Sequence, residues 1–248
     1  MFYFLMKPVL AYNFILIAAA VIPAVALLIY VYRADRLEKE PVGLILKLVV
    51  LGILSTLLAS LTEQIGDIVL SCFYSEGTLP YDLIMYFGIV AFAEEGFKYL
   101  LLKNRTWRSP EFNCLFDGVV YAVSVSLGFA LWENIGYVMQ YGIGAAVARA
   151  LTAVPGHACF GVFMGAWYGS AKRRDLQGDP KRSGRCRRMA VLVPAILHGL
   201  YDFIAVRQTE ALSAVFVVFV LAMFITAYRL VLHISRNDQY LNPHWDVF

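Results

Sequence analysis

The sequence predicts an all-α membrane protein, a polytopic bundle of about seven transmembrane helices. Of its 248 residues, 60% are hydrophobic and only 16% are charged, which is too apolar for a water-soluble domain. The apolar residues gather in stretches of the length that a bilayer crossing requires, roughly 20 residues each. Short connections with charged residues, glycine or proline separate these stretches. This pattern predicts a single membrane domain over residues 1–248.

The predicted spans are residues 9–32, 43–61, 80–102, 117–138, 147–170, 189–206 and 211–232. The first is long for the hydrophobic segment of a signal peptide and lacks a clear cleavage site of small residues, so we interpret it as a retained helix. The longest polar connection, Lys172 to Arg188, is too short to bury a core of its own. The four cysteines have no metal-binding spacing and are predicted on both sides of the membrane and within it, which argues against disulfides.

Lysine and arginine residues predict the orientation, since short cytosolic loops carry an excess of them. They concentrate in three connections: 33–39, 103–108 and 172–188. The connections 62–80 and 137–146 contain neither residue type and are expected outside. The N-terminus is therefore predicted outside and the tail, 233–248, in the cytosol. Contact of the basic loops with anionic lipid accounts for the net charge of +3 without a nucleic-acid partner.

Ionisable side chains within a span cost several kcal/mol to insert, so each is a functional-site hypothesis by default. They lie on four predicted spans: Glu94, Glu95 and Lys98 on the third, Glu133 with Asn134 on the fourth, His157 on the fifth, and His198 with Asp202 on the sixth. Glu94 and Lys98 are four residues apart, as are His198 and Asp202, so each pair shares a helix face. For any one pair, a structural clasp between helices is an equal alternative. Acids and imidazoles on four helices together favour a site.

The expected depth of each residue in the membrane indicates whether these side chains can come into contact. At about 1.5 Å per residue, Glu94 and His198 lie about 13 and 15 Å from the predicted cytosolic edge. His157 and Glu133 lie about 22 and 24 Å from it, and Asp202 about 21 Å. Taken literally, these depths form two tiers, although a shift of a few residues in the span boundaries permits one cluster.

The fifth span combines small residues with a proline. Gly161, Gly165 and Gly169 recur every fourth residue, which lets a neighbouring helix approach closely. Pro155 precedes His157 by two positions, and a proline within a span bends the helix and frees a backbone carbonyl. We therefore expect a kink beside this histidine.

Four blocks follow one another along residues 85–205: Ala93-Glu94-Glu95-Gly96-Phe97-Lys98; Phe116 to Tyr121 with Gly128 to Asn134; His157 with its glycine-rich helix; and His198-Gly199-Leu200-Tyr201-Asp202. In this order they resemble the PrsW family, bacterial membrane proteases associated with site-1 cleavage of anti-sigma factors in stress responses. The resemblance implies an intramembrane endopeptidase of the bacterial cytoplasmic (inner) membrane with a protease-like core at about 80–206. Its substrate would be a single-span membrane protein such as an anti-sigma factor.

The wider relatives, the CAAX-protease and bacteriocin-processing membrane enzymes, share a Phe-x-x-x-His block. This chain has Phe129-x-x-x-Glu133 in its place. The ligand set of those relatives therefore cannot be carried over wholesale, and His157 is the candidate for the missing imidazole.

Peptide hydrolysis needs a base for the attacking water and a group that stabilises the oxyanion. Glu94 is the expected base, and Glu95 an orienting carboxylate. His157 and His198 either bind zinc together with Glu133 or act directly as oxyanion donors. Zinc is the preferred cofactor on ligand type, but no His-Glu-x-x-His helix is present, so a metal-free glutamate mechanism stays open. The remaining predicted site residues are Lys98, Asn134 and Asp202.

Two other classes of function stay open at this point. Chains of acids and histidines also build the proton relays of transporters. A transporter would be expected to show internal repeats with broken helices in matching positions, and none is evident. A non-catalytic membrane scaffold or immunity protein is also compatible with the sequence. Phosphate-binding glycine motifs are absent, which argues against nucleotide use.

Overall fold

The computed structural model describes residues 2–207 and 209–241, with side chains from residue 12 onward. Regular structure in this part of the chain is helical, and an isolated bridge joins Cys114 and Tyr240. The elements are α1 (Phe2–Ala34), α2 (Val42–Ser71), α3 (Leu79–Leu83), the π-helix η1 (Ile84–Val90), α4 (Ala91–Thr106), α5 (Asp117–Tyr141), α6 (Ile143–Leu151), α7 (Ala153–Leu176), α8 (Pro180–Val206) and α9 (Glu210–Arg236). The predicted all-α fold class is confirmed.

Six helical stretches of the described chain are long and apolar enough to cross a membrane, with α6 and α7 together counted as one. A further helical run through α3, η1 and α4 covers the predicted span 80–102. This run is not among the six, and it carries the charged residues of the first motif block. The molecule is a multi-pass helical membrane protein, and the number of seven spans stays a prediction.

Two predicted connections turn out to be largely helical. α2 continues to Ser71, well past the predicted span end at 61, because glutamate and glutamine are good helix formers and polarity alone does not end a helix. Likewise, α7 continues to Leu176 and α8 begins at Pro180, so the basic connection is mostly a helical hairpin. Asp179 caps α8 by accepting a hydrogen bond from the backbone N–H of Arg182 at 3.0 Å.

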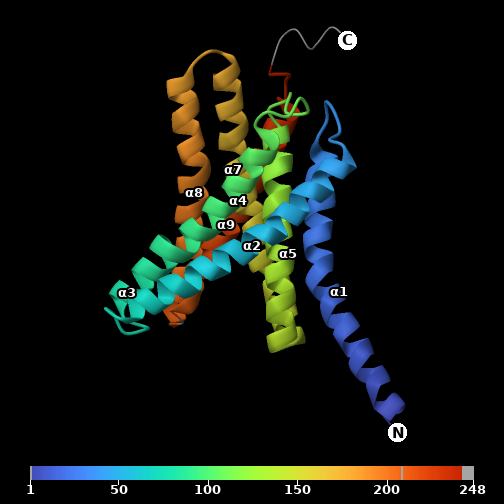
Figure 1. Ribbon diagram of the computed structural model, residues 1–248, viewed down its shortest axis with the longest axis vertical. Coiled ribbons are helices and arrows are strands. Elements are labelled where there is room, and N and C mark those ends of the chain that lie inside the picture. The colour runs from blue at the N-terminus through green and yellow to red at the C-terminus, as the bar shows by residue number, and fades with distance from the viewer. Residues whose placement is uncertain (1, 208, 242–248) are drawn as a thin grey trace.

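Helix α5 runs through the middle of the bundle in Figure 1, and its first half is buried. It packs against α7 through glycines. A Cβ atom at Gly165 would lie 2.4 Å from the Cα atom of Val119, and one at Gly169 would lie 2.4 Å from the carbonyl oxygen of Leu115. At Gly161 the nearest atom would be a backbone Cα at 2.9 Å. Only glycine fits such distances, so the predicted close helix approach is confirmed.

The predicted kink at Pro155 is instead a break one turn earlier. Helix α6 ends at Leu151, Thr152 has φ −125° and ψ −68°, and α7 begins at the next residue. Pro155 lies in the first turn of α7, where a backbone N–H is not needed. A proline ring also clashes with the carbonyl group four residues before it, which here belongs to Leu151, the last residue of α6. The break therefore places His157 near the start of a new helix.

The two ends of the bundle differ in charge. Figure 1 shows the connections α1–α2, α4–α5 and α7–α8 at one end, together with the end of α9, whereas α3 and the start of α1 lie at the other. The three basic connections therefore share one face, as the orientation rule requires, while the orientation itself stays a prediction. Of the predicted tail, 233–248, the first residues belong to α9 and residues 242–248 lie outside the described chain.

Candidate active site

Helix α4 carries a buried triad of charged residues. Glu94, Glu95 and Lys98 are 5%, 0% and 0% exposed. The Nζ atom of Lys98 lies 3.1 Å from Oε2 of Glu94 and 2.8 Å from Oε1 of Glu95. The predicted pairing of Glu94 with Lys98 is present, and Glu95 joins it from the adjacent position. The π-helix η1 directly precedes this triad, and π-helical turns occur frequently at functional sites.

The His157 side chain of α7 links two of the other helices. Its Nδ1 atom lies 3.3 Å from Nζ of Lys98, and its Nε2 atom lies 2.9 Å from Oε2 of Glu133 on α5. An ammonium group can only donate, so Nδ1 must accept and the ring proton belongs on Nε2. His157 then donates to the Glu133 carboxylate while it accepts from Lys98.

The His198 side chain of α8 lies between carboxylates. Its Nδ1 atom is 3.1 Å from Oε1 of Glu95 and 3.8 Å from Oε2 of Glu94, and its Nε2 atom is 3.3 Å from Oδ2 of Asp202. The predicted pair of His198 and Asp202 is thus present. The rings of His198 and His157 approach to 5.3 Å between centroids. All four helices of the predicted site therefore meet in one cluster, and the two tiers suggested by depth are not separate.

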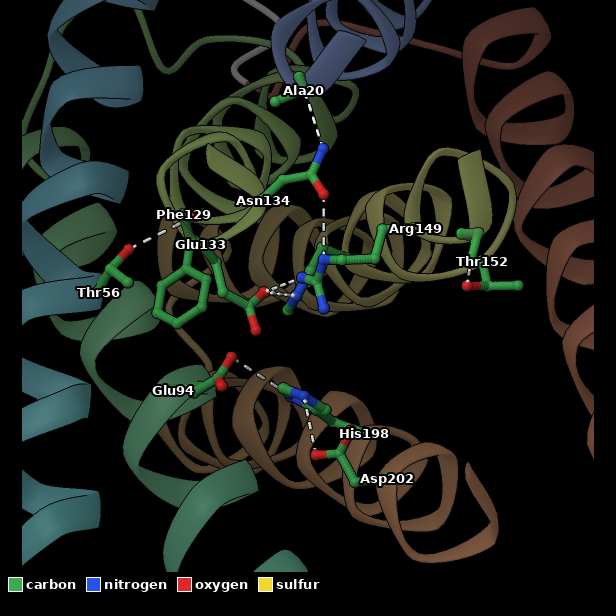
Figure 2. Close-up of polar contacts among 12 residues, drawn as sticks. Ala20, Thr56, Glu94, Phe129, Glu133, Asn134, Arg149, Thr152, His198 and Asp202 are labelled. Carbon is green, nitrogen blue, oxygen red and sulfur yellow. Dashed lines mark hydrogen bonds and ion pairs between the residues drawn. The ribbon is translucent and has the colours of Figure 1, made fainter. Parts of the chain in front are cut away.

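Arg149 is a member of the site that sequence reasoning missed. This α6 residue donates to Oε2 of Glu133 at 2.8 Å and to Oδ1 of Asn134 at 3.0 Å. Its guanidinium also lies 3.9 Å from the ring centroid of Tyr137. Asn134 donates in turn to the carbonyl oxygen of Ala20 on α1 at 2.9 Å, so it positions Arg149 and anchors the first helix rather than facing the cluster. Figure 2 shows this chain from Ala20 through Asn134 and Arg149 to Glu133.

The site faces a cavity of about 400 Å³. Its ionisable lining residues are Glu63, Glu94, Glu133, Arg149, His157, His198 and Asp202, and Tyr86, Tyr137 and Tyr201 also line it. Glu95 and Lys98 are not part of the lining, which places them behind Glu94. Glu63 was missed because the predicted α2 span ends before it. Its Oε1 atom is buried without a hydrogen-bond partner among the described residues.

The cavity lies away from the basic end of the bundle. Glu133 is in the last third of α5, His157 is near the start of α7, and Asp202 is near the end of α8. These three helix ends lie opposite the basic connections in Figure 1. Figure 2 shows Glu94, Glu133 and His198 directed into the same space.

Four residues of the cluster carry donor atoms that lie close enough together to hold a metal ion, and three of these residues now contact Nζ of Lys98. Glu94, Glu95, His157 and His198 each offer one ligand atom, and these atoms lie within 4.8 Å of one another. Two imidazoles with carboxylates are an ordinary ligand set for catalytic zinc. Glu133, the carboxylate predicted as the third ligand, is not in this group of four and instead lies on the far ring nitrogen of His157.

The charge balance of the cluster is also compatible with a bound metal ion. Glu94, Glu95, Glu133 and Asp202 are four carboxylates, whereas the permanently cationic partners are Lys98 and Arg149. Glu94 and Glu95 are buried, and the side chains of Glu133 and Asp202 are only 22% and 23% exposed, so these carboxylates need compensating positive charge. A divalent cation or protonated groups can supply what the two side chains do not. The Oε2 atom of Glu95 is also buried without a hydrogen-bond partner in the described chain.

Comparison with known proteins identifies the family. The model of the PrsW family intramembrane metalloprotease matches residues 40–228. Protease PrsW of Halalkalibacterium halodurans is 31% identical over 226 residues, which cover 91% of this chain and 100% of the relative. Protease PrsW of Oceanobacillus iheyensis is 34% identical over 218 residues (87% and 94%), and that of Bacillus subtilis is 34% identical over 191 residues (77% and 83%). No solved structure matches the chain.

The match spans the helices that form the cavity, from the start of α2 into α9. A membrane protease, rather than a transporter or an inert scaffold, accounts for the cluster of acids and imidazoles. The chain belongs to the PrsW family of intramembrane metalloproteases and is a multi-pass membrane protease of bacterial type.

Proposed function

We propose that this protease hydrolyses a peptide bond of a single-span membrane protein, with Glu94 as the base that activates water. The placement of the α4 carboxylates carries the proposal. Glu94 lines the cavity, whereas Glu95 and Lys98 are 0% exposed and lie behind it. A base must reach the water that it deprotonates, and of the two adjacent glutamates only Glu94 does.

The other residues have separate tasks in this proposal. Glu94 takes the proton of the attacking water and returns it to the amide nitrogen of the leaving peptide. Lys98 holds the two α4 carboxylates in place, and Glu95 orients the Nδ1 side of His198. Glu133 orients His157, and Arg149 fixes Glu133.

His157 and His198 are the proposed metal ligands, together with one carboxylate. The sequence favours Glu133 as that carboxylate, and the distances favour Glu95 or Glu94. If Glu94 were the ligand, the base would have to be Glu133. When bound, zinc supplies a Lewis acid that polarises the scissile carbonyl and makes a bound water more acidic.

We further propose that the substrate is an anti-sigma factor and that the reaction is its site-1 cleavage in stress signalling. The position of the cavity supports this. It lies away from the basic end of the bundle, so with the predicted orientation it lies in the outer half of the membrane. Cleavage there would separate the extracytoplasmic part of a single-span protein from its anchor.

Co-expression with candidate single-span anti-sigma factors tests both proposals. Cleavage of one candidate should be visible by immunoblot with the wild-type enzyme. Glu94→Gln keeps the shape of the side chain but cannot accept the proton, so cleavage should fall by at least about 100-fold. Glu76→Gln, at an exposed position between α2 and α3, is the matched control and should cleave normally. Full activity of Glu94→Gln at normal membrane levels would refute the assignment of the base.

A further inference from the structure

The second motif block contains a segment that the active site does not use. Residues Phe116 to Tyr121 do not line the cavity. Asp117 is the first residue of α5 and lies at the other end of that helix from Glu133. It is nevertheless only 1% exposed. A buried acid at the basic end of the bundle requires its own explanation.

Three carboxylates meet at this end. Asp35 and Glu40 belong to the connection between α1 and α2, and Asp117 begins α5. Each offers an oxygen within 4.8 Å of the other two. Asp35 and Glu40 are 2% and 4% exposed. Three buried like charges so close together are strongly unfavourable unless a cation or protons neutralise them.

Two of the three carboxylates have hydrogen-bond donors. Oδ2 of Asp117 accepts from the backbone N–H groups of Asn113 and Cys114 at 2.9 and 2.6 Å. Oε2 of Glu40 accepts from the hydroxyl group of Tyr121 at 2.7 Å. These donors orient one oxygen of each carboxylate and bring no formal positive charge.

The Asp35 carboxylate has no such donor. Both of its oxygens are buried without a hydrogen-bond partner in the described chain. The backbone N–H groups of Arg36 and Glu38 lie near enough to favour its charge, but neither reaches hydrogen-bond geometry. A fully buried carboxylate directed at two others, with both oxygens free, is what a bound cation would explain.

The nearest ammonium group, that of Lys39, lowers the pKa of Asp35 through its charge, but it directs its hydrogen bonds to backbone carbonyl groups. Nζ of Lys39 donates to the backbone carbonyl oxygens of Tyr32 at 2.9 Å, of Arg33 at 3.2 Å and of Asp35. It thus caps the last turn of α1, where positive charge is favourable. No ion pair connects the three carboxylates to a basic side chain within the described residues.

We propose that Asp35, Glu40 and Asp117 bind a hard divalent cation, Mg²⁺ or Ca²⁺, as a site separate from the catalytic centre. All three ligands are carboxylates, and oxygen-only donor sets select these ions over zinc. The ion would tie the α1–α2 connection to the start of α5. The C-terminal segment lies beside it, since Oδ1 of Asp238 accepts from the backbone N–H of Phe116 at 3.0 Å.

Shared protons are the rival explanation. Burial raises the pKa of Asp35 to about 6 and that of Glu40 to about 7, so without a cation the cluster would hold protons close to neutral pH. The two explanations differ in their response to added cations. A cation site responds to Mg²⁺ or Ca²⁺ at constant ionic strength, whereas a proton-sharing cluster does not.

Thermal unfolding and calorimetric titration of the full-length protein in detergent separate these explanations. The chelator-treated, dialysed protein receives MgCl₂ or CaCl₂ alone, with NaCl as the control for ionic strength. A saturable rise in Tm and a binding isotherm are expected for the wild type. For Asp35→Asn we expect affinity at least about tenfold lower, because the site loses one charged ligand. Asp175→Asn, an exposed acid at the same end of the bundle, should behave as the wild type.

The active site is present in all of these proteins, so the difference between wild type and Asp35→Asn reports the acidic cluster alone. Glu40→Gln serves as a second variant if Asp35→Asn fails to fold. Equal binding by wild type and both variants would overturn the proposal. A wild type that ignores both cations, with an Asp35→Asn variant more stable than it in chelator, would overturn it in favour of shared protons.

Discussion

Nε2 of His157 lies 2.9 Å from Oε2 of Glu133, so the acid that ends the Phe129-x-x-x-Glu133 block contacts the histidine supplied by α7. The same carboxylate oxygen accepts from Arg149 at 2.8 Å. The contact therefore joins α5, α6 and α7 at one carboxylate. It also leaves Nδ1 of His157 directed at the α4 triad, where it accepts from Nζ of Lys98 at 3.3 Å, so a metal ion bound by this nitrogen would have to displace that contact.

If His157 and His198 hold a catalytic zinc, the purified protein should contain about one zinc per chain. His157→Ala and His198→Ala should lose both the metal and proteolysis, and added zinc should restore a chelated wild type. Metal content by mass spectrometry measures this directly. Full proteolysis without bound metal would reject zinc and leave the histidines as oxyanion donors.

The third ligand can be identified by the same measurement. Glu133→Gln and Glu95→Gln each remove one charge and keep the side-chain shape. The variant at the ligand position should lose zinc, whereas the variant at an orienting position should keep it and lose activity by roughly 10- to 100-fold. If both variants kept zinc at full occupancy, Glu94 would be the carboxylate ligand, and Glu133 would then have to act as the base.

Arg149 is predicted to position Glu133 rather than to contact substrate. Arg149→Lys keeps the charge but cannot contact Glu133 and Asn134 through two fixed nitrogens, so kcat should fall by roughly tenfold. In Arg149→Ala, kcat should be lower still, and the affinity for zinc should also be reduced. Arg182→Ala, an exposed arginine of α8, is the control. An effect of Arg149→Lys on KM alone would indicate substrate binding instead.

Gly165→Ala should destabilise the bundle, because the new Cβ atom would lie 2.4 Å from a backbone Cα of α5. Overpacking of this kind costs about 1–3 kcal/mol or more. Gly184→Ala in α8 meets no atom within 4 Å and should be neutral or slightly stabilising through helix propensity. Thermal unfolding in detergent compares the two. Equal Tm values would show that α5 and α7 pack less closely than described.

Cysteine labelling with an impermeant thiol reagent tests the orientation. Cys72 is exposed and should react in intact cells, whereas Cys186 should react only after permeabilisation. Cys114 should stay unreactive in both cases, since burial raises the pKa of its thiol. Labelling of Cys186 from outside would invert the predicted topology.

Much of the site was predictable from the sequence because its spacing is local. Helical periodicity alone places Glu94 with Lys98 and His198 with Asp202, and both contacts are present. The high cost of burying charge then requires partners on other helices. Which partners meet depends on packing, and the contact of His157 with Glu133 could not be read from spacing.

The depths estimated from the sequence were misleading for helices that are tilted in the bundle. The two-tier estimate assumes spans along the membrane normal, but α2 and α4 cross the bundle obliquely in Figure 1. Because these helices are tilted, Glu94 lies at the same level as His157, although the two residues are different numbers of residues away from the basic connections. The same rule that identified Glu94 applies to Arg149, which lies within the predicted span 147–170. Glu63 could be recognised as a site residue only once α2 was known to continue past residue 61, and the polar residues in this stretch had suggested that the helix ends there.

Backbone-to-backbone contact along Gly161, Gly165 and Gly169 leaves α5 and α7 no side-chain layer through which to slide or rotate. Two helices locked in this way act as a rigid wall that keeps Glu133 and His157 at constant separation. Entry of a substrate segment must therefore come from displacement of other walls of the cavity. The π-helix η1 contributes Tyr86 and Val90 to that lining. Its close contacts with Gly66 of α2 and Gly199 of α8 are mainly through the side chains of Ile89 and Phe87, so we expect η1 to move more readily than α5 or α7.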